Sequence, residues 1–137
     1  MSSFGQLIPE VATVVPYAAG DYTASGAMTW TVEAVDRLDY SYTRRGKNVL
    51  ISINIDGSVV GGVASSALRV ALPAGLTPSS TQVGPAVGAD NGVASFINYR
   101  APSGSTFIEF RRTDGANWTL SPVNGTNVIM NAEIAMN

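Results

Sequence analysis

The segment that decides the fold of this chain is Val49–Ser58, which reads Val-Leu-Ile-Ser-Ile-Asn-Ile-Asp-Gly-Ser. Large β-branched residues occupy every second position of its first part: Val49, Ile51, Ile53 and Ile55. A period of two places these side chains on one face of a strand and their neighbours on the other face. Asp56-Gly57 ends the run as a turn signal. The segment therefore predicts a strand with one face in a hydrophobic core.

Two segments upstream of this strand show the same alternation. Met28–Glu33 alternates the apolar residues Met28, Trp30 and Val32 with Thr and Glu. In Leu38–Thr43, the apolar positions expected to share one face are Leu38, Tyr40 and Tyr42. Arg44–Lys47 then supplies a tight turn, in which Gly46 can adopt a positive φ. The upstream half of the chain therefore predicts two further strands.

The downstream half contains several more candidate strands. They are Leu68–Leu72, Val93–Arg100, Thr106–Arg112 and Val128–Met136, with an edge strand expected near Gln82–Val87. Asn91-Gly92, just before Val93, is a hairpin signal. About eight strands with short turns and no clear helix predict an all-β fold, an antiparallel β-sandwich of jelly-roll type. Residues 28–137 are expected to form this sandwich domain.

Residues 1–27 differ from the rest of the chain and predict an extended N-terminal arm with a first edge segment. Pro9 and Pro16 interrupt the segment, and its β-branched residues favour an extended chain over a helix. Such a segment is either an edge strand of its own domain or an arm on a neighbouring protein. We expect the arm, with docking side chains Phe4, Leu7, Ile8, Val11, Val14 and Val15.

The composition limits the class of partner. The chain has 137 residues, enough for one domain, and only 13% of them are charged, with a formal net charge of −2. This balance implies no surface for polyanions, so no nucleic-acid partner is expected. Proline and glutamate interrupt the apolar residues between Phe4 and Tyr17, so no membrane span is expected either.

The absence of His and Cys removes most catalytic chemistry. Neither a Ser-His-Asp triad nor a thiolate nucleophile can be built, and His- or Cys-bound metals are excluded. The closest acidic cluster is Glu33, Asp36 and Asp39, which could serve as a calcium site or a glycosidase pair. A solvated strand end is the favoured interpretation, because Asp is common in turns. We therefore predict no catalytic residue, no metal site and no cofactor.

The loop that contains Asp114, Asn117 and Trp118 is the remaining candidate binding site. An exposed indole ring can stack on the face of a sugar while nearby polar groups bind the hydroxyls. The same ring can instead fold under the loop and close one end of the sandwich. Because Trp is buried on average, we expect Trp118 to fill the core.

Several segments together resemble a known class of module. They are Gly20–Val32, Tyr40–Thr43, Gly46-Lys47, Val60–Gly62 and Leu68–Gly75. The pattern is similar to small β-sandwich modules of bacteriophage structural proteins, found in fibres and on capsid surfaces. The resemblance implies a module that is not an enzyme and that forms a homotrimer.

The expected function follows from this resemblance. A long fibre would carry a shaft of repeats or coiled coil, and this chain shows neither pattern. We therefore expect a capsid decoration (cement) protein on the outer surface of the virion, bound to the major capsid protein and strengthening its lattice. The alternative is a short fibre or receptor-binding tip that recognises a host surface glycan.

Overall fold

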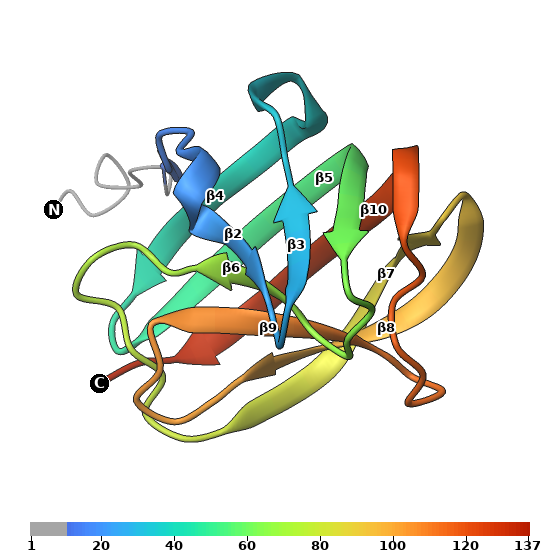
Figure 1. Ribbon diagram of the computed structural model, residues 1–137. Helices are drawn as coiled ribbons and strands as arrows, with labels where there is room; N and C mark the ends of the chain where they lie inside the picture. The colour runs from blue at the N-terminus through green and yellow to red at the C-terminus, as the bar shows by residue number, and fades with distance from the viewer. Residues whose placement is uncertain (1–10) are drawn as a thin grey trace, which may run out of the picture.

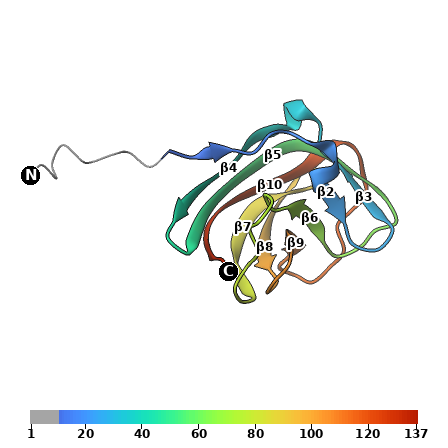
Figure 2. The same ribbon diagram turned by 90° about the vertical axis from the view of Figure 1, so that its left-hand side faces the viewer.

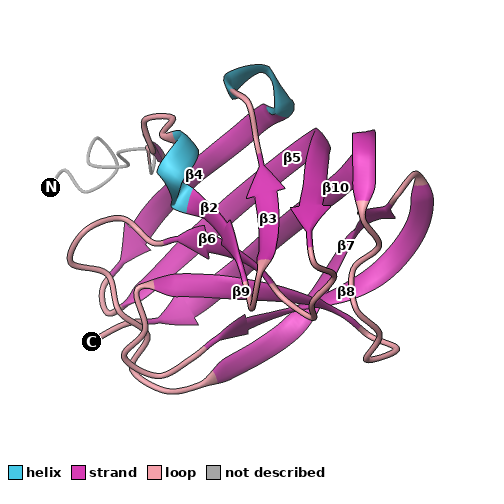
Figure 3. Ribbon diagram, in the orientation of Figure 1, coloured by secondary structure: helices cyan, strands magenta, loops and turns pink. Residues whose placement is uncertain are grey.

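The computed structural model describes residues 11–137, and the predicted all-β class is confirmed (Figure 3). Besides the strands, the described chain has two short 3₁₀ turns, η2 (Ala19–Asp21) and η3 (Ala34–Asp36). The strands are β1 (Thr13–Val14), β2 (Tyr22–Ala24), β3 (Met28–Thr31), β4 (Arg37–Arg45), β5 (Asn48–Gly62), β6 (Leu68–Ala71), β7 (Gln82–Asp90), β8 (Val93–Ala101), β9 (Phe107–Arg112) and β10 (Ser121–Ala135).

All the strands belong to one antiparallel sheet, which curls into a half-barrel (Figures 1 and 2). The order is β1-β4-β5-β10-β7-β8-β9-β6-β2. β3 lies off this path and pairs with the C-terminal part of β5, from Val59 to Gly62, whereas β4 pairs with the N-terminal part. The two walls of the sandwich-like fold are therefore continuous with each other, and they face each other across one core.

The deciding segment lies at the centre of this core. β5 and β10 are both 15 residues long and pair antiparallel over most of their length. The predicted turn at Asp56-Gly57 is wrong, because β5 continues through it to Gly62, where it pairs with β3. The four alternating β-branched residues of β5 are completely buried, as predicted. They share the core with side chains from β10 and from the opposite wall: Val128, Met130, Ile134, Leu68, Val70, Ile97, Ile108 and Phe110.

The predicted edge strand near Gln82–Val87 is instead part of the nine-residue strand β7, which lies between β10 and β8. β7 pairs with β10 only from Val87 to Ala89, so Pro85 lies where no ladder partner is present on that side. This explains how a strand with a proline, which cannot donate a backbone hydrogen bond, sits inside the sheet. The predicted hairpin is confirmed, because Asn91 and Gly92 both have positive φ, 50° and 80°.

The predicted face of Leu38 is wrong, because β4 contains a β-bulge at this residue. Arg37 pairs with Ile55 and Asp39 with Asn54, so Leu38 is an extra residue without a partner. A bulge re-aims the side chain that it carries. Leu38 therefore points outward and is 62% exposed, while Tyr40 is buried in the core.

The N-terminal segment is divided between the domain and its surface. Phe4, Leu7 and Ile8 lie outside the described residues. Thr13 and Val14 form β1 at the edge of the sheet, paired with β4. The arm prediction is wrong for Val15, which belongs to the domain's own core and donates its N–H to Tyr40 O at 2.9 Å. Val11 and Val14, by contrast, are largely exposed.

Trp118 fills the end of the core, as expected. Its side chain is fully buried, and its Nε1 donates a hydrogen bond of 3.1 Å to the carbonyl of Phe110 in β9. Its backbone N–H donates to Ser65 O at 2.9 Å. The loop before β10 is therefore held to β9 and to the segment after β5 through one residue.

We predict that Trp118→Ala lowers the free energy of unfolding by about 3–5 kcal/mol, because it leaves a large cavity in the core. Trp118→Phe keeps a ring in the core but loses the Nε1 hydrogen bond, and it should cost less. Urea denaturation followed by circular dichroism measures both. A loss of less than about 1 kcal/mol for the alanine variant would contradict this role of the indole ring.

Candidate functional site

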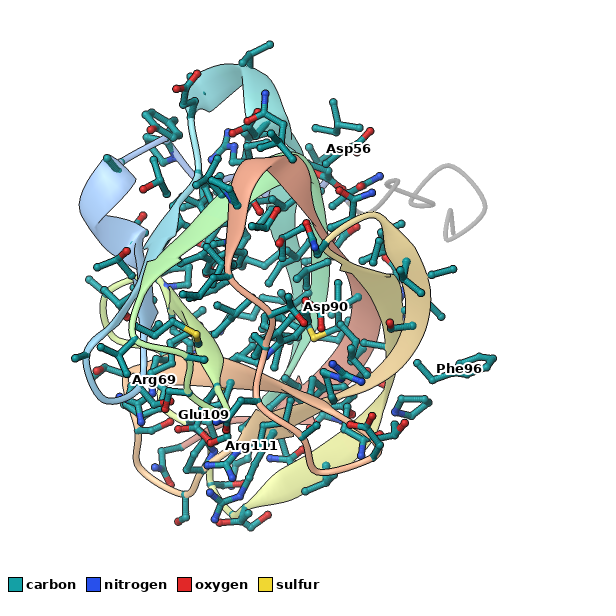
Figure 4. The ribbon with its side chains drawn as sticks, turned by 45° about the vertical axis from the view of Figure 1, so that its right-hand side comes forward. Asp56, Arg69, Asp90, Phe96, Glu109 and Arg111 are labelled. Carbon is teal, nitrogen blue, oxygen red and sulfur yellow. The ribbon has the colours of Figure 1, made fainter. Side chains whose placement is uncertain are left out.

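The outer face of the curled sheet carries an apolar surface over β7, β8 and β10. Ile129 pairs with Val87, and Val87 pairs with Phe96, so these three side chains form one cross-strand row. Val83 and Pro85 extend the surface along β7, where outward positions alternate with inward ones. We call these five residues the Phe96 face. Phe96 itself is 77% exposed and projects from the side of the molecule (Figure 4).

An arginine cluster lies next to this face, on the outer side of β6, β8 and β9. In the sheet register, Glu109 is directly opposite Arg69 on one side and Arg100 on the other. Arg69 Nη2 lies 3.0 Å from Glu109 Oε1, and Arg111 Nη2 lies 3.2 Å from Glu109 Oε2. Glu109 is only 3% exposed beneath these side chains (Figure 4).

The arginine cluster has more positive charge and more hydrogen-bond donors than Glu109 can satisfy. Three guanidinium groups surround one carboxylate, which leaves a local excess of positive charge. Arg100 Nη1 is 3.7 Å from Glu109 Oε2, beyond hydrogen-bonding distance, and its side chain is 44% exposed. Because each guanidinium has five N–H donors, Arg100 can bind a further carboxylate or another anion.

The two features form one surface. Val83 of the Phe96 face is the register partner of Arg100, and Pro85 is the partner of Asn98. Side chains of directly opposed residues are neighbours on the same face of a sheet. The outer side of β7–β9 therefore presents an apolar area bordered by cationic side chains, a combination suited to protein contacts.

Two of the three predicted glycan contacts, Asp114 and Trp118, have partners within the domain. The sugar-stacking alternative is wrong for Trp118, because a buried indole offers no ring face. Asp114 accepts a 2.5 Å hydrogen bond from Arg112 Nη2, and the pKa of its carboxyl is lowered, first by the backbone N–H of Ala116 and then by Arg112. Asp114 and Asn117 both remain exposed, whereas Trp118 is buried.

Behind this loop, a buried carboxylate holds the chain in place. Asp90 Oδ2 accepts hydrogen bonds from Arg112 Nη1 at 2.7 Å and from Thr119 Oγ1 at 3.0 Å. Asp90 Oδ1 accepts from the Thr119 backbone N–H at 3.0 Å. Asp90 and Arg112 also line a small polar depression beside the β7–β8 turn. Because its oxygens are paired within the domain, Asp90 has a structural role.

The acidic cluster predicted from the sequence has local structural partners. The N–H of Glu33 donates to Asp36 Oδ2 at 2.9 Å at the start of η3, and Ser52 Oγ donates to Asp39 Oδ2 at 2.7 Å. Within residues 11–137, no group of three His, Cys, Asp or Glu side chains is arranged to hold a metal ion. None of the helices in this part of the chain is long and apolar enough to cross a membrane.

No protein-family model, curated protein or solved structure matches the chain. Function therefore has to be inferred from the surfaces of the chain itself. The sequence reasoning missed both the Phe96 face and the arginine cluster. The alternation of large Val83, Pro85 and Val87 with Gly84, Ala86 and Gly88 was an available signal, because it places the larger apolar groups on one face of β7.

We predict that Glu109→Gln destabilises the domain by about 1–3 kcal/mol, because three arginines then lose their shared carboxylate. Glu133→Gln is the matched control, since Glu133 is an exposed strand residue of β10. Urea unfolding of the two variants measures the difference. Equal stabilities would show that the arginine cluster needs no internal counter-charge.

Proposed function

We propose that the chain is a non-enzymatic structural protein of a bacteriophage virion, a homotrimeric decoration protein on the outer capsid surface that strengthens the lattice of the major capsid protein. The Phe96 face is the observation that carries this proposal. The setting on a virion is supported by the resemblance of Met28–Val32 and Leu68–Pro73 to phage β-sandwich modules.

The Phe96 face calls for a protein partner. Phe96 is 77% exposed and Val83 is 61% exposed, and the two belong to one continuous surface with Val87 and Ile129. A contiguous apolar area of this kind on a soluble domain marks an interaction site, whereas single exposed apolar residues do not. A sheet face that contacts only water would have polar side chains here, like the outward residues Ser52 and Asn54 of β5.

A second copy of the chain is the partner that we assign to this face. Burial of apolar surface stabilises an interface by about 25 cal/mol per Å², before association costs are subtracted. A few hundred Å² per subunit therefore contribute several kcal/mol. Closed symmetry repeats this contribution at every subunit of a trimer and leaves no Phe96 face uncovered.

The N-terminal segment is the part assigned to the major capsid protein. Val11 and Val14 are 79% and 64% exposed and precede the first residue of the core, Val15. The apolar positions before them, Phe4, Leu7 and Ile8, give the segment the composition of a docking arm. The glycan alternative has no comparable support, since its aromatic residue is buried.

Cryo-electron microscopy of purified virions tests the proposed location directly. Density for the β domain is expected on the outer capsid surface, around three-fold positions of the lattice. Density at a fibre tip would favour the receptor-binding alternative. Particles that lack the chain, shown by mass spectrometry, would overturn the proposal.

We predict that Phe96→Ser and Val83→Ser weaken self-association without loss of stability, because both side chains are exposed in the single chain. Val63→Ser is the matched control for Val83→Ser, as Val63 is 65% exposed and lies outside the Phe96 face. Sedimentation equilibrium of the variants measures the trimer dissociation constant. If all three variants associate like the wild type, the Phe96 face is not the contact between copies.

We predict that deletion of residues 2–12 leaves a folded trimer that no longer binds capsids. The deletion stops before Thr13, because Val15 is in the core and Tyr17 donates a 2.6 Å hydrogen bond to Val32 O. Co-sedimentation with capsids stripped of the protein gives the occupancy. Unchanged occupancy of the truncated chain would contradict the role of the arm.

A further inference from the structure

We infer that the copies of this chain associate head to tail, the Phe96 face and arginine cluster of one copy receiving an acidic, apolar end of the next copy. The inference deepens the proposed function, on which it rests, by naming the two surfaces that meet. The acidic end is defined by Glu33, Val35, Leu38 and Asp56.

The acidic end is built by η3 and the bulge in β4. Val35 lies in η3 and is 77% exposed, and the bulge turns Leu38 outward to 62% exposure. Arg37 pairs with Ile55, so Asp56 comes at the same end of the β4–β5 ladder. Two large apolar side chains and the carboxylates of Glu33 and Asp56 are thereby exposed at one end of the domain.

The carboxylates of this end form no ion pair with the described residues, 11–137. Among residues 11–137, the ion pairs involve Asp90, Glu109 and Asp114, and none includes Glu33, Asp36 or Asp56. Asp36 is buried beneath this end, and its carboxyl lies close to Gly57, the neighbour of Asp56. Arg37, the cation of β4 nearest this end, donates instead to the carbonyl of Val15. The acidic end therefore has an excess of negative charge, and the arginine cluster has an excess of positive charge.

The two surfaces are complementary in both charge and apolarity. Phe96 and Val83 can bury Val35 and Leu38, while Arg100 and Arg111 face Glu33 and Asp56. Complementary potentials of this kind orient partners and fix the register of an interface. Both areas combine an apolar centre with a border of charges of one sign. A surface that contacts only water has no use for this arrangement.

The two surfaces lie on different parts of the same subunit, so one chain cannot join them to each other. The sheet register runs from Asp39 through Asn54, Ile129 and Val87 to Phe96, which is four strand spacings or about 19 Å. Figure 4 shows Asp56 at one end, with Arg69, Glu109 and Arg111 together at the other. Contacts between unlike surfaces are heterologous, and they close into a ring when the rotation permits. A closed ring of three copies satisfies every such surface.

Charge reversal with rescue in the same chain tests the inference. Arg100→Glu and the pair Glu33→Arg with Asp56→Arg each make one surface repel its partner. We expect each to raise the trimer dissociation constant at least tenfold in sedimentation equilibrium. The triple variant restores opposite charges and should return to within threefold of the wild type. Arg44→Glu, at the far end of β4 beside the β4–β5 turn, is the control.

Several results would overturn the inference. One is that the charge-reversed variants raise the trimer dissociation constant no more than Arg44→Glu does. Another is that the triple variant associates no more tightly than the variants from which it is built. A third is that the chain binds a 20-nucleotide single-stranded DNA and that this binding depends on Arg100. Thermal melts check folding, and Arg100→Gln, which removes charge without repulsion, should weaken association in the same direction. If the chain is found on virions but its trimer dissociation constant does not change with salt concentration, only this inference is refuted. If virions lack the chain, only the proposed function is refuted.

Discussion

The fold depends on one constraint, that a single antiparallel sheet must bury one face by curling around it. The two 15-residue strands β5 and β10 form the centre of the sheet, and their inward β-branched and apolar side chains are excluded from water. Trp118 and β3 close the end that curling leaves open. No second sheet or helix covers the outer face within residues 11–137. The outward side chains of the described sheet are therefore covered only by one another, as Glu109 is by the arginines, or they meet water or another molecule.

The outer face is divided by chemistry along the strand order. Over β4 and β5 the outward residues include Asp39, Ser52 and Asn54, which suit contact with water. Over β7, β8 and β10 they are Val83, Val87, Phe96 and Ile129, and beside these stands the arginine cluster. Under the proposed function, this division gives the domain an apolar contact surface, and the charged borders of that surface give the contact its specificity.

The sequence was sufficient to predict most of the strands, because alternation in segments such as Val49–Ile55 is a local property. It did not predict that β5 continues past Asp56-Gly57 or that β10 begins at Ser121. It could not show that the two walls are one sheet, since strand order depends on distant pairing. The Phe96 face was missed because β8 has large apolar residues at adjacent positions, Phe96 and Ile97, so the period does not tell which one points inward. In β7, the inward Gly84 leaves room for Tyr99, whose ring would lie 2.3 Å from an added Cβ. The Arg69–Glu109–Arg100 row joins three strands that only the register brings together.

Hydroxyl-radical footprinting of the wild-type chain tests most directly whether the Phe96 face is a covered surface. Oxidation of each residue is measured by mass spectrometry in nanomolar solution and in solutions concentrated enough for assembly. Phe96 is expected to oxidise readily in the dilute chain and to become protected on assembly, as Val35 and Leu38 do, while the 40% exposed Leu120 reacts equally in both. Equal oxidation of Phe96 under the two conditions would contradict this assignment.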